Sequence, residues 1–344
     1  MNVTCVHDAH DEAAWEQFVQ SRQEACGYHI VAWGGLISRV FGHRAYYLMA
    51  RDQEGQVRGV LPLVFMKSPL FGCFLTSIPF FNYGGVLFET VDARDALLNT
   101  AAEMARGLEA THIELRQTVS LEIGWPVRSH KVSMRLELPQ RYEDLLKAFP
   151  SKLRSQVRRG EKEGMTSRLG GLDLLDDFYQ VFARNMRDLG TPVYDKGFFR
   201  EILQSFSKGA RICAVYLNDR PVAAGFVIGF RGTLEIPWAS SDRRYARLAP
   251  NMVLYNAVLQ YACTEGYQEF DFGRSTLNSG TYRFKEQWGA KPLTLYWYYW
   301  LSEGTKPPEL NPQNPKYRLA IRMWRHLPVP VTKLVGPAIV KYLP

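Results

Sequence analysis

Lys285, in the segment YRFKEQWGAKP, is the first residue whose type and position indicate chemistry. It follows a predicted strand that ends in Gly273 and Arg274, so its ammonium is expected near the end of a sheet. A lysine in such a place could hold a phosphate or stabilise a developing oxyanion. The alternative is a solvated charge on a loop.

Three carboxylates on predicted strands are candidates for proton transfer. Asp271 and Glu269 fall on one face of the strand YQEFDFGR, because side chains alternate along a strand. Asp271 could be a general base or could pair with an arginine, whereas a structural role is expected for Glu269. Glu235, in TLEIPWASS, is a further candidate base, with an edge-strand surface charge as the alternative. Pro237 cannot donate to the sheet, which predicts a bulge or a splayed strand beside Glu235.

Two basic segments could bind an anion. In SDRRYARLAPN (241–251), Pro250 marks the start of a helix whose first N–H groups favour negative charge. The candidate ligands in this segment are Arg243, Arg247 and Asn251, with Arg244 adding charge. The second segment is a helix over 151–163, with Ser151 expected to cap its start and Gly164 its end. Its basic residues are Lys152, Arg154, Arg158, Arg159 and Lys162. Arg154 and Arg158 are candidates for contact with tRNA or with the diphosphate of a lipid- or nucleotide-linked acceptor; the alternative is an exposed charged face.

The segment NYGG (82–85) could line a groove. Its two glycines permit close backbone approach, so Asn82 and Tyr83 could bind an acceptor between two domains. The alternative is a simple turn.

The elements that must position these residues occur twice in the same order. In the first half, 46–66 reads as strand, turn and strand, followed by a Gly/Pro-rich stretch, a helix over 93–110 and a strand over 111–116. The second half repeats this order over 211–230, 233–241, 249–266 and 267–274. The repeat predicts an α/β (α+β) protein of two tandem domains, each a mixed sheet flanked by helices. The expected domains are 1–140 and 141–302, followed by a Pro-rich linker and basic tail over 303–344.

The composition of the chain indicates its class of partner and its cellular compartment. The chain has 344 residues, a formal charge of +8 and a pI of about 9.2, which favours anionic partners. Five cysteines without a Cys-x-x-Cys pair argue against disulfides or a zinc site, and His7 and His10 lack a second ligand pair, so no metal is expected. The polar, acidic N-terminus and the lack of a long apolar run predict a cytoplasmic protein.

The C-terminal segment KYRLAIRMWRHLP has an amphipathic pattern. Arg318, Arg322 and Arg325 fall on one side of the expected helix; the other side carries Leu319, Ala320, Met323, Trp324 and Leu327. A helix of this kind could lie on the inner face of an anionic membrane, or it could dock on the body of the protein.

FDFGRS (270–275) followed by SGTYRFKEQWGAKP (279–292), together with NYGG and the basic helix, resembles the FemAB family over about residues 10 to 300. The similarity is greatest to the FemAB-like proteins of exosortase/PEP-CTERM exopolysaccharide systems. The resemblance implies two GNAT-like domains that transfer an acyl or aminoacyl group to an amine of a cell-envelope precursor. It also implies that Lys285 lies at the donor site, that a strand splay seats the acyl group, and that peptidoglycan or exopolysaccharide precursors are acceptors. Beside Lys285, the candidate substrate-binding residues are Arg274, Tyr282, Phe284 and Trp288.

The donor remains open between aminoacyl-tRNA and acyl-CoA, and no tightly bound cofactor is expected. Ala246, Leu248 and Ala249 stand where CoA-dependent GNAT enzymes carry a Gly-rich pyrophosphate loop, which argues against CoA. The alternatives are a CoA-dependent N-acetyltransferase acting on an amino sugar and a non-catalytic glycan-binding adaptor.

Overall fold

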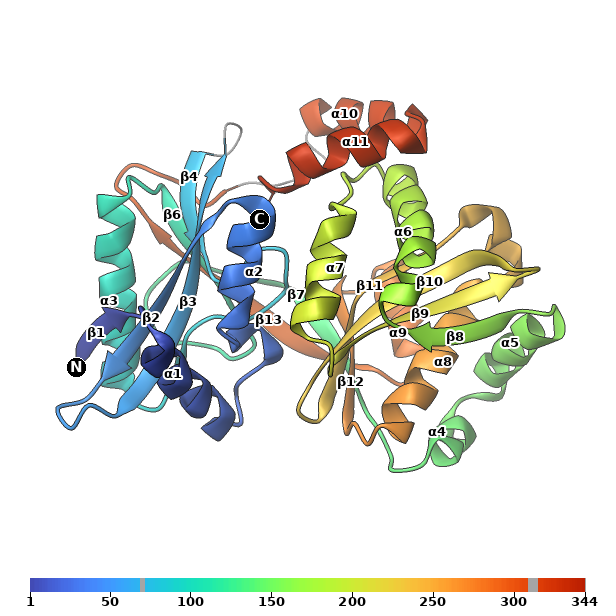
Figure 1. The fold of residues 1–344 in the computed structure, drawn as a ribbon, viewed down its shortest axis with the longest axis horizontal. Coiled ribbons are helices and arrows are strands. Elements are labelled where there is room, and N and C mark those ends of the chain that lie inside the picture. The colour runs from blue at the N-terminus through green and yellow to red at the C-terminus, as the bar shows by residue number, and fades with distance from the viewer. Residues whose placement is uncertain (69–71, 309–314, 344) are drawn as a thin grey trace. The chain divides into compact units, whose positions relative to one another are not determined.

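The computed structural model describes residues 1–68, 72–308 and 315–343, and its contacts divide the chain into two compact units (Figure 1). Unit 1 holds the described residues of 1–132, 294–308 and 341–343; unit 2 holds those of 133–293 and 315–340. Residues 294–302, expected in the second domain, therefore pack in unit 1. The basic tail over 315–340 packs in unit 2 rather than forming a separate segment.

Unit 1 is a mixed sheet in the order β1-β2-β3-β4-β6-β13, with the short β5 beside β3. Its strands are β1 (Asn2–Cys5), β2 (Arg44–Arg51), β3 (Val57–Ser68), β4 (Gly72–Thr76), β5 (Leu87–Phe88), β6 (His112–Gln117) and β13 (Lys291–Leu301). The strands of this unit pair antiparallel, except that β4 pairs with β6 in parallel. β4 lies within the stretch expected to be irregular, because its apolar run Cys73–Leu75 is too short to stand out from the surrounding glycines and prolines.

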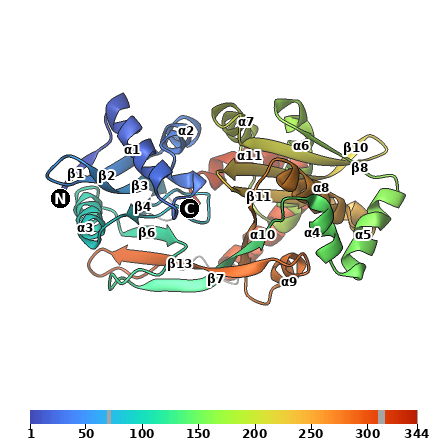
Figure 2. The same cartoon turned by 90° about the horizontal axis from the view of Figure 1, so that it is seen from below.

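Helices cover both faces of the unit 1 sheet: α1 (Ala9–Ser21) and α2 (Ala32–Phe41) on one side and α3 (Val91–Gly107) on the other (Figure 2). Alternation along β3 explains the two layers. Leu63 packs in the cluster beneath α3, whereas Val64 packs with Ile37 of α2 on the opposite face. The side chain of Thr90 caps α3 by accepting the N–H of Ala93 at 3.2 Å.

Unit 2 repeats this arrangement in the order β8-β9-β10-β11-β12-β7. Its strands are β8 (Thr166–Gly170), β9 (Ala210–Leu217), β10 (Arg220–Phe230), β11 (Thr233–Ser241), β12 (Glu269–Thr276) and the last residues of β7 (Val127–Glu137). Asn218 and Asp219, both at positive φ, form the tight turn between β9 and β10. As in unit 1, the fourth strand of the order, here β11, pairs in parallel with the strand after the helix, here β12, and the pairings from β8 to β11 are antiparallel. The predicted duplication of a mixed α/β sheet is confirmed.

The helices of unit 2 also form two layers. α6 (Leu175–Leu189) and α7 (Lys196–Ser205) cover one face with an aromatic cluster that includes Phe178, Phe199 and Trp238. α8 (Pro250–Thr264) covers the other face, and α4 (Tyr142–Ala148) and α5 (Ser151–Lys162) pack on it. The remaining helices are α9 (Gly280–Glu286), α10 (Pro315–His326) and α11 (Val329–Val340). Over the described residues, no helix is long and apolar enough to cross a membrane.

Candidate active site

β11 and β12 diverge at the centre of unit 2. Their parallel register covers three pairs and ends where Glu235 faces Asp271, although both strands continue beyond this point. On its other edge, β11 changes register against β10: Phe226 faces Trp238 and Ile228 faces Glu235. β11 therefore carries one extra residue next to Pro237, which confirms the predicted bulge. The divergence leaves backbone groups of two neighbouring strands facing a gap.

Lys285 lies on α9 and reaches β12 just beyond Asp271, the last residue that pairs with β11. Its side chain is only 7% exposed, and Nζ donates hydrogen bonds to the carbonyl oxygens of Gly273 (2.8 Å) and Arg274 (3.0 Å). Burial lowers the pKa of Lys285 to about 8, while the charges of Asp271 and Glu235 act in the opposite direction. The ammonium thus stays mostly protonated at neutral pH. Lys285 is not a solvated charge on a loop, and the structure brings it together with both predicted catalytic carboxylates.

The helix that carries Lys285 is short and locally specified. The Ser279 hydroxyl accepts the N–H of Tyr282 at 3.2 Å and caps its first turn. The ring of Phe284 lies 5.1 Å from that of Tyr255. Trp288, fully buried, packs edge-on to Phe149 with 5.3 Å between ring centroids. Phe284 and Trp288 therefore fix α9 on α8, whereas Tyr282 is half-buried and Arg274 is exposed.

Asp271 holds the strand in place for Lys285. It is fully buried, and its Oδ1 accepts hydrogen bonds from Ser133 Oγ (2.5 Å) and from the N–H of Gly273 (2.7 Å). The second bond stabilises Gly273 at a φ of 75°, a conformation that glycine adopts without strain. In this conformation, the carbonyls of Gly273 and Arg274 both accept hydrogen bonds from Lys285. These hydrogen bonds give Asp271 a structural role, and its role as a base stays a prediction.

Arg135, on β7, joins the two acidic residues of β12. Its Nη1 pairs with Glu269 at 2.9 Å, and its Nε lies 3.6 Å from Asp271. Glu269 thus has the structural role expected for it. Ser133 and Arg135 were missed in the sequence because they lie more than 130 residues away from their partners along the chain.

Glu235 is the last residue of β11 that pairs with β12, so its carboxylate lies where the two strands begin to part. It is 5% exposed and lies on the central strand β11, so it is not an edge-strand surface charge. As the parallel register partner of Asp271, it projects from the same face of the sheet. Because Asp271 is held by Ser133 and Gly273, Glu235 is the better-placed candidate for proton transfer.

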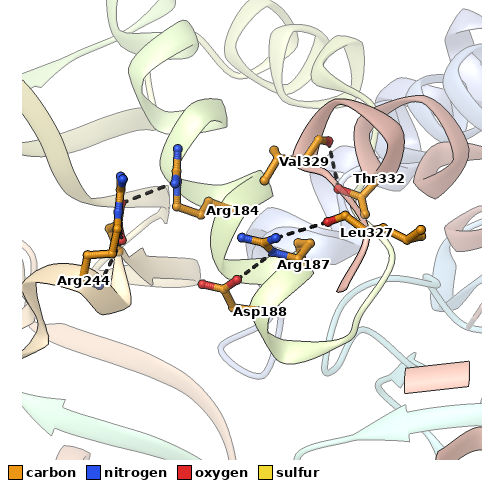
Figure 3. Close-up of polar contacts among 8 residues, drawn as sticks. Arg184, Arg187, Asp188, Arg244, Leu327, Val329 and Thr332 are labelled. Atoms are coloured by element: carbon orange, nitrogen blue, oxygen red, sulfur yellow. Dashed lines mark hydrogen bonds and ion pairs between the residues drawn. The ribbon is translucent and has the colours of Figure 1, made fainter. Parts of the chain in front are cut away.

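The segment before α8 presents arginines beside a helix start. Residues Arg243–Leu248 form a 3₁₀ helix, and Ala249 adopts a φ of 54° immediately before Pro250. Arg244 donates to both carboxylate oxygens of Asp242, and Arg184 pairs with the same carboxylate at 3.5 Å (Figure 3). Arg243 and Arg247 are exposed, and Asn251, in the first turn of α8, is half-buried. These three predicted ligands remain candidates for an anionic donor.

α5 turns its basic side outward. Its buried side packs on α8 through Gly160, where a Cβ would lie 2.4 Å from Val253. Arg158 is exposed and Arg154 half-buried. The helix begins at Ser151, with Pro150 as N-cap, so the predicted serine cap is wrong; the expected glycine end is confirmed by Gly164 at a φ of 82°.

Asn82 and Tyr83 belong to unit 1, where both make contacts with other residues of that unit. Tyr83 is 4% exposed and its ring lies 5.6 Å from that of Tyr28. The Asn82 carbonyl accepts Trp297 Nε1 at 3.3 Å, and the Gly84 N–H donates to the carbonyl of Arg116 at 3.1 Å. The acceptor-binding role of Asn82 and Tyr83 stays a prediction.

At the position in unit 1 that corresponds to Asp271, the protein has a buried ion pair. Glu114 of β6 faces Thr76 of β4 in a parallel pair, as Asp271 faces Glu235. Arg116 folds back onto Glu114 at 2.7 Å and donates to the carbonyl of Phe81. Both members of the ion pair are buried, so side chains of the protein itself occupy this position in unit 1.

Comparison with known proteins agrees with this reading of unit 2. Residues 147–286, which include Glu235, Asp271 and Lys285, match the sequence profile of the acetyltransferase (GNAT) domain. Over these residues the chain therefore carries a domain of the acetyltransferase (GNAT) type. No curated protein sequence gives a significant match.

Three solved structures share the tandem fold. The crystal structure of FemX matches with a TM-score of 0.67 at 16% identity, over 93% of this chain and 100% of FemX. L-PGS from Bacillus licheniformis matches at 0.57 and 14% identity, over 96% and 97% of the two chains. A tandem GNAT protein from the clavulanic acid biosynthesis pathway matches at 0.57 and 13% identity, over 89% and 99%. At these identities the likeness establishes a tandem GNAT-like fold.

Proposed function

We propose that unit 2 transfers an acyl or aminoacyl group from an activated ester or thioester to an amino group of a cell-envelope precursor. The observation that carries this proposal is the placement of Lys285 and Glu235 at the point where β11 and β12 part. A cation and a carboxylate beside a gap between strands are the groups that such a reaction requires.

The reaction forms a C–N bond and breaks the C–O or C–S bond of the donor. The attacking amine must lose a proton, and Glu235 is the carboxylate placed to accept it. Negative charge develops on the carbonyl oxygen and then on the leaving group, which takes up a proton on release. An ammonium has three N–H donors, of which two are donated by Lys285 to β12 carbonyls. Lys285 thus supplies a fixed positive charge at the site, where low solvent access strengthens it.

Extended ligands could bind along the diverging strands. The edge of β11 beyond Glu235 presents backbone groups that an extended donor arm or peptide can pair with, as in strand addition. Arg243 and Arg247 lie at the end of the same strand and suit phosphate groups of the donor. We favour aminoacyl-tRNA as donor, since Ala249 stands where a flexible glycine would serve a CoA pyrophosphate.

For the acceptor we propose a peptidoglycan or exopolysaccharide precursor with a free amine, linked to a nucleotide or a lipid. The motif resemblance to FemAB-like proteins of exopolysaccharide systems and the fold likeness to FemX support this choice. The basic net charge of +8 suits a phosphorylated carrier.

An acyl-transfer assay tests the proposal. Radiolabelled aminoacyl-tRNA and radiolabelled acetyl-CoA are offered in turn, with a UDP-linked muramyl peptide or a UDP-linked amino sugar as acceptor. We expect label to move from aminoacyl-tRNA to an acceptor amine. Lys285→Met should lower kcat/KM by about 10²–10³ and Glu235→Gln by about 10²–10⁴. Lys291→Met, which removes an exposed lysine six residues later, should leave the rate unchanged.

The outcomes separate the alternatives. Transfer from acetyl-CoA alone would make the chain a CoA-dependent N-acetyltransferase of amino sugars. Acceptor binding without transfer, equal in wild type and both variants, would point to a glycan-binding adaptor and refute the catalytic assignment.

A further inference from the structure

The C-terminal helices α10 and α11 carry large apolar side chains that face solvent. On α10, Leu319 is 61% and Met323 63% exposed. On α11, Leu334 is 81% exposed, Val335 40% and Val331 39%. Residues three or four apart share one face of a helix, so each helix presents a continuous apolar strip rather than scattered positions. We call these five residues the C-terminal face.

The orientation of α11 is fixed by the opposite side of the helix. Thr332, Gly336 and Val340 are buried at four-residue spacing. At Gly336 a Cβ would lie 2.8 Å from the backbone N of Val193, so α11 touches the backbone between α6 and α7. This contact leaves Leu334 and Val335 pointing away from unit 2.

α10 is held in the same way. A Cβ on Gly190, at the end of α6, would lie 2.5 Å from the side chain of Ile321. Arg325 donates to the carbonyl of Leu189 at 3.2 Å, and Arg187 donates to the carbonyl of Leu327 between the two helices at 3.1 Å (Figure 3). Both helices thus dock on α6 through one side (Figure 1). Their exposed apolar side chains lie on the other side.

The chain segment that carries this face has charge of one sign. From residue 315 to the end, the chain has no aspartate or glutamate. Its basic residues are Lys316, Arg318, Arg322, Arg325, Lys333 and Lys341. Arg318 and Arg322 are exposed next to Leu319 and Met323, so cations flank the apolar strip of α10. An apolar strip bordered by arginines complements a surface that is anionic outside and apolar beneath.

We propose that the C-terminal face binds the surface of an anionic phospholipid bilayer. Leu319, Met323 and Leu334 enter the region between headgroups and acyl chains, while Arg318 and Arg322 contact lipid phosphates. Each helix has 12 residues and is about 18 Å long, shorter than the ~30 Å hydrocarbon core, so the pair lies on the membrane rather than crossing it. This binding is independent of acyl transfer, and it would bring the enzyme to lipid-linked acceptors.

Vesicle sedimentation with the full chain tests the proposal. Wild type is mixed with vesicles of phosphatidylglycerol and phosphatidylethanolamine in equal parts, and separately with vesicles of phosphatidylcholine alone. We expect sedimentation with the anionic vesicles only, and weaker binding in about 1 M salt, where the Debye length is ~3 Å. Arg322→Gln should lower the partition coefficient about fivefold, whereas Arg220→Gln, at an exposed arginine on β10, should not.

The apolar contribution needs its own pair of variants. Leu334→Glu should abolish sedimentation, because a carboxylate replaces the most exposed apolar side chain of the face. Leu172→Glu is the matched control, since Leu172 is 50% exposed elsewhere in unit 2. Circular dichroism and urea unfolding check that both variants fold as wild type does.

Two results would overturn the proposal. Equal binding to phosphatidylcholine vesicles, or full binding by Leu334→Glu, would show that this face does not recognise an anionic bilayer. A wild-type dimer in light scattering that Leu334→Glu converts to a monomer, without vesicle binding by either form, would make the face an interface between two copies.

Discussion

Lys285 makes the free energy of unfolding depend on pH in a way that Lys285→Met should remove. The folded-state pKa of Lys285 is lowered from 10.5 to about 8 by burial. Below pH 8 both states hold the proton, and the cost of burying the charge is fully present. Between about pH 8 and 10.5 the folded state has released a proton that the unfolded state still binds. The free energy of unfolding therefore rises with pH in this window.

The size of the effect follows from the two pKa values. Between pH 7 and pH 9.5, Lys285 should add about 2 kcal/mol to the free energy of unfolding. Other groups act over the same range: burial raises the pKa of Cys213 to about 12, so its thiol lowers stability as pH rises above its unfolded pKa. Methionine has no titrating group and a similar length, so the difference between wild type and Lys285→Met isolates the lysine.

Urea unfolding followed by tryptophan fluorescence measures this difference. Wild type, Lys285→Met and the exposed-site control Lys291→Met are unfolded at pH 7 and at pH 9.5. We expect wild type to gain about 2 kcal/mol relative to Lys285→Met on going to the higher pH, and to gain nothing relative to Lys291→Met. A wild-type advantage over Lys285→Met that is equal at both pH values would mean that the ammonium is not desolvated beneath β12, and the electrostatic argument for the site would fail.

Three further substitutions test neighbouring parts of the argument. Gly273→Ala forces a Cβ into a φ of 75° and should cost about 1–2 kcal/mol in urea unfolding, with a loss of transfer activity. Arg116→Met leaves Glu114 buried without its cation and should lower the free energy of unfolding by about 3–5 kcal/mol. The double variant Arg116→Met/Glu114→Gln should lower it less. An equal loss in both variants would contradict a paired charge at this position. Arg247→Gln should raise the KM for a phosphate-bearing donor about tenfold while Arg220→Gln leaves it unchanged; equal KM values would remove this arginine from the donor site.

Local patterns in the sequence predicted much of the second unit. The bulge at Pro237 follows from the missing N–H of one residue, and the turn at Asn218 and Asp219 follows from their tolerance of positive φ. The helix over 249–266 is observed as Pro250–Thr264, and the candidate lysine is found at the end of the predicted strand. These features depend on few neighbouring residues, so they can be read without tertiary contacts.

The long-range contacts that hold the side chains of the candidate site could not be predicted in this way. Ser133 and Arg135 lie on a strand that crosses from one unit into the other, and nothing in their local sequence indicates that they face Asp271. The burial of Lys285 was also hidden, since a lysine in a short polar segment usually faces water. Its burial results from α9 docking on α8 through Phe284, a contact between segments far apart in sequence.

The two units show how one fold can support either chemistry or structure. Glu114 and Asp271 occupy corresponding positions, each paired with the strand before the helix. Two residues later, unit 1 has Arg116, whose guanidinium pairs with Glu114. Unit 2 has Gly273 at that position, and the carbonyls of Gly273 and Arg274 accept hydrogen bonds from the ammonium of Lys285, which comes from a separate helix. In unit 2 the cation is delivered from α9, a separate short helix. A cation carried on the strand itself is fixed with the sheet. Catalysis in unit 2 and support in unit 1 are the roles that this difference favours.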